Sequence, residues 1–208
     1  SGPTRANLDA VRFLSNRSTG RLGSAIAEEA LDRGADVTLV AGPGSRRPDP
    51  RDGLEVTPIE TVDDLVESVE DRLAGNGYDA VVHAMAVLDY VPASAEQGKV
   101  RSGRDEWTLR LVKTPKVIQK IRYRAPGALL VGFKLEVGAD DEGLRRAAAE
   151  TMEKSGADLV VANDLQDIGA ERHPAMILEP TGRTLAEPET KEGIARSLCD
   201  LLAERLVD

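Results

Sequence analysis

Residues 21–41, RLGSAIAEEALDRGADVTLVA, join a helix pattern to a strand pattern through one glycine. In residues 21–33 apolar side chains recur every three to four positions, which predicts an amphipathic helix, and Gly34 suits the left-handed residue that commonly follows one. Residues 36–41 form a short apolar run of strand length. A helix followed by a buried strand is the repeating unit of a parallel sheet that is covered by helices.

The same alternation continues along the rest of the chain. It predicts a doubly wound (Rossmann-like), mostly parallel sheet with helices on both faces, folded as a single domain over residues 1–208. Thr61 is expected to cap the second helix, and Thr114 with Pro115 to open the third. The predicted strands are 54–59, 79–85, 128–133, 158–162 and 175–178, and the predicted helices are 62–73, 114–123, 140–155 and 188–206.

Two segments depart from this alternation. Residues 89–111 are too long and polar for a simple strand-to-helix connection, and residues 107–111 alternate like an exposed strand. We therefore expect a strand-containing functional excursion near residues 90–112. Residues 1–4 (SGPT) have the composition of a turn after a strand, although no apolar strand precedes them. The first strand of the sheet is therefore expected to be missing before residue 1.

Composition excludes several classes of protein. With 208 residues and 41% hydrophobic content the chain supports one substantial core, and its net charge of −9 argues against nucleic acid as a partner. No window approaches the ~20 apolar residues of a membrane span, and no apolar leader is present, so a cytoplasmic location is expected. The single cysteine, Cys199, lies on an apolar helix face and is interpreted as buried filler rather than a nucleophile.

The segment 15–24, SNRSTGRLGS, places small polar residues directly before the first helix. A helix N-terminus presents unpaired N–H groups and a partial positive charge, so Ser18, Thr19 and Gly20 suit a phosphate or carboxylate ligand. Ordinary helix capping by the same hydroxyl groups explains the pattern equally well. The sequence leaves both interpretations open.

Further polar residues follow the ends of predicted strands, where ligands bind in doubly wound sheets. Residues 83–90 (HAMAVLDY) combine small residues, which would let a planar base approach the backbone, with the carboxylate of Asp89. Lys99 and Arg101 would point to one side of an extended segment and could neutralise a polyphosphate. A surface aspartate and solvated surface cations are the simpler alternatives. Asn163 and Asp164 are either a turn or a ligand contact.

Together these segments resemble the phosphopantothenate-cysteine ligase (phosphopantothenoylcysteine synthetase) family. Residues 11–20 (VRFLSNRSTG) are similar to its V-R-x-I-[ST]-N-x-S-[ST]-G signature, and residues 1–5 to its S-G-G-T-R opening. In the same order along the chain, residues 83–92, 99–101, 113–118, 131–134 and 157–164 resemble its A-A-V-A-D-Y-x-P, K-I-[KS], T-P-[DK]-I-[IL], V-G-F and D-x-[IV]-[VI]-A-N-D elements. The variants in these segments look most like those of the stand-alone bacterial form.

The resemblance implies a two-step ligation in coenzyme A biosynthesis. The carboxylate of 4′-phosphopantothenate would attack CTP to give an acyl-cytidylate and pyrophosphate, and the amine of L-cysteine would then displace CMP, with Mg²⁺ neutralising the phosphates. The implied catalytic residues are Asn16 and Lys99. The implied acyl-substrate residues are Asn16, Ser18, Thr19 and Gly20; the implied nucleotide residues are His83, Ala84, Met85, Asp89, Lys99, Pro115, Lys116, Val117, Ile118, Phe133 and Lys154; and Asp89 is the implied Mg²⁺ ligand.

The chain departs from the family pattern at Glu150, which stands where the family has the first of two helical lysines; Lys154 matches the second. Arg146, one turn earlier on the same face, is a candidate substitute. The resemblance also implies a homodimer, in which the excursion reaches across the interface, and a possible separate phosphopantothenoylcysteine decarboxylase.

Two other functions remain as alternatives. One is a nucleotide-binding module of the same fold without catalysis. The other is a short-chain-type NAD(P) reductase, although the chain lacks both the G-x-G-x-x-G fingerprint and a Tyr-x-x-x-Lys pair. His83 is interpreted as a packed histidine at a strand end rather than as a titrating group.

Overall fold

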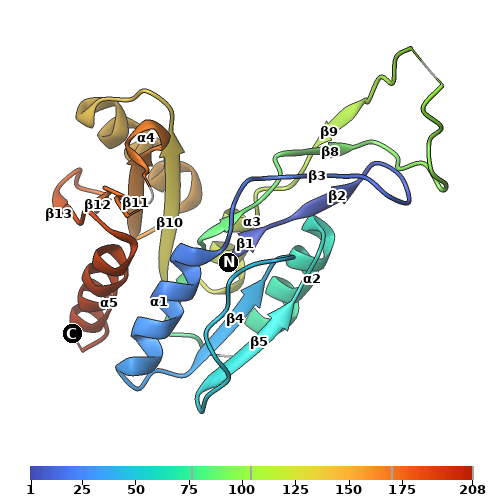
Figure 1. The fold of residues 1–208 in the computed structure, drawn as a ribbon. Helices are drawn as coiled ribbons and strands as arrows, with labels where there is room; N and C mark the ends of the chain where they lie inside the picture. The colour runs from blue at the N-terminus through green and yellow to red at the C-terminus, as the bar shows by residue number, and fades with distance from the viewer. Residues whose placement is uncertain (76, 104, 170, 208) are drawn as a thin grey trace.

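The computed structural model describes residues 1–75, 77–103, 105–169 and 171–207 (Figure 1). It contains a central sheet flanked by helices, and an arm of four short strands that projects from one side (Figure 1). The helices are α1 (Arg21–Asp32), α2 (Val62–Leu73), α3 (Val117–Arg124), α4 (Asp141–Ser155) and α5 (Lys191–Val207), with the 3-10 turn η1 (Leu165–Asp167). The strands are β1 (Gly2–Pro3), β2 (Arg5–Asn7), β3 (Phe13–Ser15), β4 (Val37–Ala41), β5 (Leu54–Pro58), β6 (Ala80–Val82), β7 (Met85–Ala86), β8 (Tyr90–Pro92), β9 (Leu111–Lys113), β10 (Leu129–Glu136), β11 (Leu159–Asp164), β12 (Met176–Leu178) and β13 (Thr184–Ala186).

The largest sheet has the strand order β13-β12-β11-β10-β6, in which β6, β10 and β11 run parallel and β12 and β13 antiparallel. Two further parallel pairs, β4 with β5 and β1 with β7, adjoin it. The Gly42 N–H donates to the Ser1 carbonyl oxygen at 2.9 Å, and the His83 N–H donates to Val131 at 2.9 Å. These bonds place β1 between β4 and β7, and join the segment after β6 to β10.

Helices cover both faces of the sheet. Alternate residues of β10, β11 and β12 face opposite sides, as strand geometry requires. Leu130, Val160 and Leu178 pack with α2, α3 and α4, whereas Val131 and Val161 pack with α1 and α5. The predicted doubly wound α/β fold is therefore confirmed.

The arm consists of the antiparallel pairs β2–β3 and β8–β9 with the described residues that connect each pair. Just beyond the end of β2, the Glu96 N–H donates to the Leu8 carbonyl oxygen at 3.0 Å. Further out, the carboxylate of Asp9 accepts from the Val100 N–H at 3.0 Å and pairs with Arg12. Two stretches far apart in sequence thus form one projection (Figure 1).

Several predicted elements agree with the structure. Residues 62–73 form α2 as expected, and Thr61 makes a full capping box with Asp64. Gly34 adopts φ +85° after α1. Asp140, the first residue of the predicted fourth helix, is the N-cap of α4 and accepts from the Gly143 N–H at 2.8 Å.

Other predicted elements are wrong in detail. Thr114 does not cap a helix, because its hydroxyl donates to the Leu88 carbonyl oxygen at 2.7 Å, and α3 begins three residues later. Residues 79–85 do not form one strand, because β6 pairs with β10 whereas β7 pairs with β1. The expected turn at residues 1–4 contains β1, paired with β7. The exposed strand expected at 107–111 lies at Leu111–Lys113, and α5 begins at Lys191 rather than 188.

Candidate functional site

Asn16 lies beside the turn that follows β7. Its side-chain Nδ2 donates to the Ala86 carbonyl oxygen at 2.9 Å. Next to it, the fully buried Thr4 accepts from the Leu88 N–H through Oγ1 at 3.0 Å, and its carbonyl oxygen accepts from Ser15 Oγ at 3.0 Å. These three hydrogen bonds, which we call the clasp, fix the Asn16 amide against residues 86–88.

The turn before α1 uses glycine geometry rather than side-chain capping. Gly20 is the N-cap residue with φ 72°, and no side chain caps the helix. A Cβ at Gly20 would lie 2.8 Å from the Cβ of Ser45, so the close approach also requires glycine. The capping interpretation of Ser18 and Thr19 is therefore wrong. Anion binding at this helix terminus stays a prediction.

Asp89 and Lys116, both predicted nucleotide residues, form an ion pair of 2.6 Å between Oδ1 and Nζ. The backbone brings them together, because the Thr114 N–H donates to the Asp89 carbonyl oxygen at 2.9 Å. Both side chains are about half exposed, so the pair is open to exchange with a ligand. Pro115 lies between these contacts.

The remaining predicted nucleotide residues fall on both faces of the sheet. Val117 and Ile118 pack on the side of α2, α3 and α4, and a Cβ at Gly132 would lie 3.1 Å from Ile118 Cδ1. Phe133 packs on the opposite side, with α1 and α5. The structure therefore does not bring Ile118 and Phe133 together on one face.

His83 and Ala84 form the bend between β6 and β7, Met85 begins β7, and all three residues are half-buried. Burial lowers the pKa of His83 to about 4, so its ring is neutral at pH 7. A neutral, half-buried ring agrees with the interpretation of His83 as a packed residue. Its backbone remains close to Val131 of β10.

Lys154 and Lys99 lie outside these contacts. Lys154 Nζ pairs with Glu150 at 3.0 Å on the exposed face of α4, and this pairing lowers the pKa of the Glu150 carboxyl. Lys99 lies on the arm, next to Val100, and among the described residues it makes no hydrogen bond or ion pair with another predicted site residue. Residues 99–101 do not form a strand. The expectation that Lys99 and Arg101 point to one side of an extended segment therefore lacks its structural basis.

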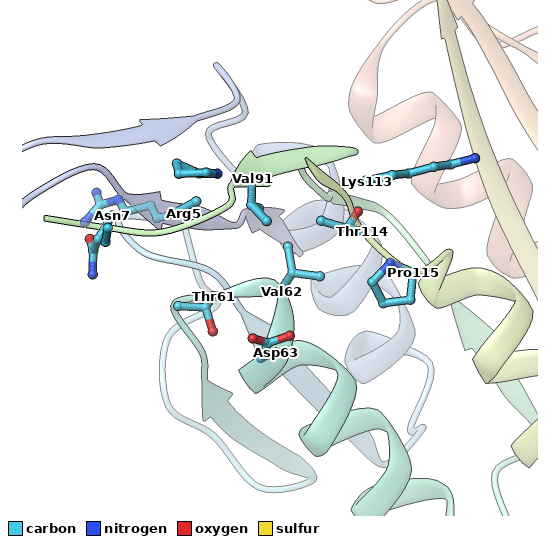
Figure 2. A pocket seen from close by; sticks show the side chains of 12 residues that line it. Arg5, Asn7, Thr61, Val62, Asp63, Val91, Lys113, Thr114 and Pro115 are labelled. Carbon is cyan, nitrogen blue, oxygen red and sulfur yellow. The ribbon is translucent and has the colours of Figure 1, made fainter. Parts of the chain in front are cut away.

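A cavity of about 280 Å³ at the base of the arm was not predicted (Figure 2). Val62 and Val91 point toward each other across it, from the start of α2 and from β8 (Figure 2). Of the predicted site residues only Pro115 lines it. Because its walls come from four distant segments, no local pattern signals it. The lining residues are Arg5, Ala6, Asn7, Thr61, Val62, Asp63, Val91, Pro92, Ala95, Lys113, Thr114 and Pro115.

Among the described residues, no group of three or more His, Cys, Asp or Glu side chains is arranged to hold a metal ion. A Mg²⁺ ion that also binds substrate phosphates needs only one or two protein carboxylates. The exposed carboxylate of Asp89 fits such a role. No helix in the described part of the chain has the length and apolar character to span a membrane.

Residues 1–206 match the family model described as DFP, DNA/pantothenate metabolism flavoprotein C-terminal domain. The chain belongs to this family. It is 39% identical over 209 residues to the coenzyme A biosynthesis bifunctional protein CoaBC of Thermococcus kodakarensis, covering 99% of this chain and 50% of the relative. It is 33% identical to CoaBC of Mycobacterium tuberculosis, covering 100% of this chain and 50% of the relative. The chain thus spans about half the length of these curated relatives.

Solved structures of similar fold include a protein with the same family description. The DNA/pantothenate metabolism flavoprotein from Streptococcus pneumoniae is similar with a TM-score of 0.90 at 32% identity, covering 99% of this chain and 96% of that one. A mutant of Cab2, H337A, in complex with phosphopantothenate-cysteine, has a TM-score of 0.76 at 21% identity, covering 100% of this chain and 87% of that one. At that identity the Cab2 likeness shows the shared fold.

Proposed function

We propose that this protein joins 4′-phosphopantothenate to L-cysteine in coenzyme A biosynthesis, consuming CTP. The substrate carboxylate attacks the α-phosphorus of CTP and releases pyrophosphate. The cysteine amine then attacks the acyl carbon of the acyl-cytidylate, loses a proton, and CMP leaves. The full-length family match and the names of the CoaBC relatives support the assignment. The observation that carries it is the clasp, which presents the Asn16 amide beside residues 86–89.

The residues around the clasp suit this chemistry. An amide N–H can donate to an oxyanion that forms at the acyl carbon, and the amide oxygen can accept from an incoming amine. The exposed Asp89 carboxylate would hold Mg²⁺, which supplies charge neutralisation on the phosphates when bound. Lys116, already paired with Asp89, is placed to exchange that carboxylate for a phosphate oxygen. The turn at Ser18–Gly20 would lie beside the acyl substrate.

We also propose that the protein is a homodimer whose arm completes the partner's site. The arm exposes several large apolar side chains, and Lys99 is one of its residues. Burying these side chains against a second copy would stabilise the dimer and deliver the lysine cation to the triphosphate. The exposed apolar side chains of the arm are Val11, Phe13, Tyr90, Leu111 and Val112.

The reaction is tested by supplying 4′-phosphopantothenate, cysteine and CTP with Mg²⁺. Pyrophosphate release is expected, and its absence with every nucleotide would refute the ligase assignment. Faster release with ATP would refute only the choice of CTP.

Asn16→Asp is expected to block amide formation while pyrophosphate is still released. Lys99→Gln is expected to slow the first step, and unchanged turnover would remove its phosphate role.

Mixing the two variants tests the arm. If Lys99 acts across the interface, a mixed dimer of Asn16→Asp with Lys99→Gln contains one intact site. Random exchange of subunits then restores about a quarter of wild-type activity. No restoration, in a sample that light scattering shows to be dimeric and exchanging, would place Lys99 in the site of its own protomer.

A second candidate function is a nucleotide-binding module without catalysis. The Glu150–Lys154 pair favours it, because an acid there reduces the positive charge available to a triphosphate. Calorimetry that shows CTP binding, together with no pyrophosphate release, would support this alternative.

We further propose that a phosphopantothenoylcysteine decarboxylase, fused or separate, consumes the product. Failure of added decarboxylase to remove CO₂ from the reaction product would refute this proposal.

A further inference from the structure

A buried polar pair closes the carboxyl end of β11. Asn163 and His173 are only 6% and 8% exposed, and Asn163 Nδ2 lies 3.4 Å from His173 Nε2. Asn163 pairs in register with Leu135 of β10, two positions beyond the pair of Val161 with Phe133. Because side chains alternate along a strand, Asn163 and Phe133 occupy the same face of the sheet. This is the face covered by α1 and α5.

The His173 ring is neutral at pH 7. Burial lowers its pKa to about 4, and the nearby Lys191 cation contributes in the same direction. When Asn163 donates to Nε2, the proton of the neutral ring resides on Nδ1. Nδ1 is buried and has no hydrogen-bond partner among the described residues. A buried polar atom without a partner destabilises the fold, so a role for the ring outside folding is indicated.

The neighbouring residue, Asp164, stabilises the loops at this end of β11. The Asp164 carboxylate accepts from the Ala139 N–H and the Gln166 N–H, each at 2.7 Å, and so ties together the loops that follow β10 and β11. Asn163 contributes no such bond: its side chain contacts only His173 among the described hydrogen-bonding partners. The amide therefore retains an N–H and an oxygen for a ligand.

Two hydrogen bonds hold the backbone on either side of Pro174, next to the His173 ring. The His173 N–H donates to the Glu189 carbonyl oxygen at 2.7 Å, and the Ala175 N–H donates to Pro188 at 3.0 Å. These bonds hold the backbone, and the burial of the side chain restricts the ring, so that the ring can select one orientation of the Asn163 amide.

We propose that His173 is a positioning residue that orients the Asn163 amide toward the nucleotide of the proposed reaction. The nucleotide lies at the carboxyl ends of β10 and β11, on the face that carries Phe133. There the amide is able to hydrogen-bond a nucleobase edge or a ribose hydroxyl. This inference rests on the proposed function. It assigns a role in that function to His173, which lies outside the segments that resemble the family.

Two neutral variants of His173 separate orientation from packing. In His173→Gln the terminal amide reaches the position of Nε2 and keeps the contact with Asn163, whereas in His173→Asn it reaches only the position of Nδ1. We expect His173→Gln to stay within about threefold of wild-type kcat/KM, and His173→Asn to lose about tenfold, as expected for one hydrogen bond. The loss should appear in KM for CTP and not in KM for phosphopantothenate.

The nucleotide-free protein supplies a second readout. The side-chain amide ¹⁵N–¹H resonances of Asn163 should be similar in wild type and His173→Gln, and shifted in His173→Asn, at equal thermal midpoints. An active wild type whose two variants have equal KM for CTP would overturn the inference alone. An inactive wild type would overturn the proposed function; calorimetry with CTP then decides the inference, and equal affinity of the two variants would overturn it.

Discussion

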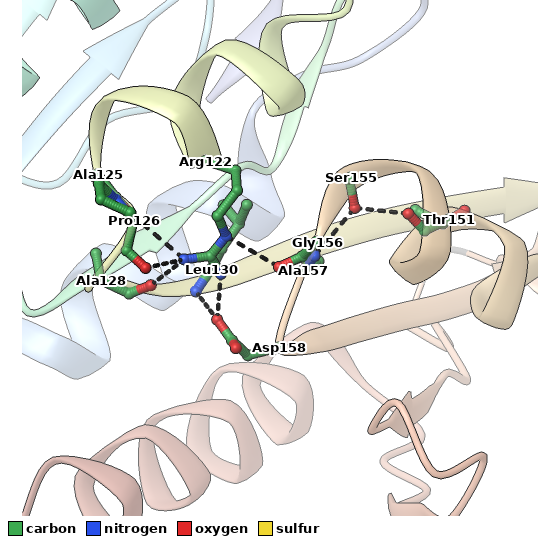
Figure 3. A network of polar contacts seen from close by, with 10 residues as sticks. All are labelled: Arg122, Ala125, Pro126, Ala128, Leu130, Thr151, Ser155, Gly156, Ala157 and Asp158. Atoms are coloured by element: carbon green, nitrogen blue, oxygen red, sulfur yellow. Dashed lines mark hydrogen bonds and ion pairs between the residues drawn. The ribbon is translucent and has the colours of Figure 1, made fainter.

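Arg122 ties the end of α3 to the starts of two core strands (Figure 3). Its Nη1 donates to the carbonyl oxygens of Pro126 at 3.0 Å and Ala128 at 2.9 Å, and its Nε donates to Gly156 at 3.0 Å. Its Nη2 pairs with Asp158 at 2.5 Å. One guanidinium thus donates to three carbonyl oxygens at 3.0 Å or less and to a fourth, that of Ala125, at 3.4 Å.

Arg122→Met retains the aliphatic stem and removes all of these bonds. Each of the three carbonyl bonds of 3.0 Å or less contributes about 1 kcal/mol net, and the long bond to Ala125 adds little. The ion pair adds about 0.5 kcal/mol after allowance for solvent, because the Asp158 side chain is 41% exposed. The free energy of unfolding should therefore fall by roughly 3 to 4 kcal/mol, and the thermal midpoint by about 10 °C for a domain of this size.

Arg124→Met is the matched control, two residues further along α3. Its side chain is 44% exposed, and it lies 3.8 Å from Glu70. We expect a change within about 0.5 kcal/mol. Both variants are measured by urea unfolding followed by circular dichroism. A loss below about 1 kcal/mol for Arg122→Met, or equal losses in the two variants, would refute the account of this network.

Two further predictions concern the sheet and the arm. Gly42→Ala would place a Cβ 1.9 Å from a backbone oxygen of β1, so it should cost more than about 2 kcal/mol in urea unfolding, whereas Gly127→Ala, with open space around it, should change stability little. Arg12 holds the pKa of the Asp9 carboxyl well below its usual range. The contribution of Asp9 to the arm is therefore complete above about pH 4 and lost as the pH falls further. Arg12 stacks on the ring of Trp107, 4.6 Å from its centroid, so Trp107 fluorescence should follow this loss; in Asp9→Asn the low-pH signal should already be present at pH 7.

Local patterns predicted most of the fold. The bounds of α2 follow from the spacing of its apolar residues and from the Thr61–Asp64 capping box. Both signals involve residues that are close together in the sequence. The prediction of one strand over residues 79–85 is wrong, because the bend at His83 depends on two different neighbours, β10 and β1. Pairing partners distant in sequence leave no local signal.

In the candidate site, too, some residues are indicated by sequence patterns and others depend on contacts between distant segments. The family resemblance indicates Asn16 and Asp89. In the structure Asn16 donates to Ala86, and Asp89, three residues after Ala86, pairs with Lys116. The prediction that Thr114 opens a helix is wrong, because a hydroxyl before proline fits a helix start as well as a bond to a distant carbonyl. No sequence pattern indicates His173, since a histidine that follows a strand carries no pattern of its own.

The arm joins segments that lie 91 positions apart at the contact of Asp9 with Val100. Such a contact forms only after the intervening chain has brought its ends together, so the arm should be among the last parts to fold and the first to open. Its amides should exchange with deuterium faster than those of β10 and β11. A second copy that covers the arm would slow this exchange as protein concentration rises, and would thereby couple assembly to local order.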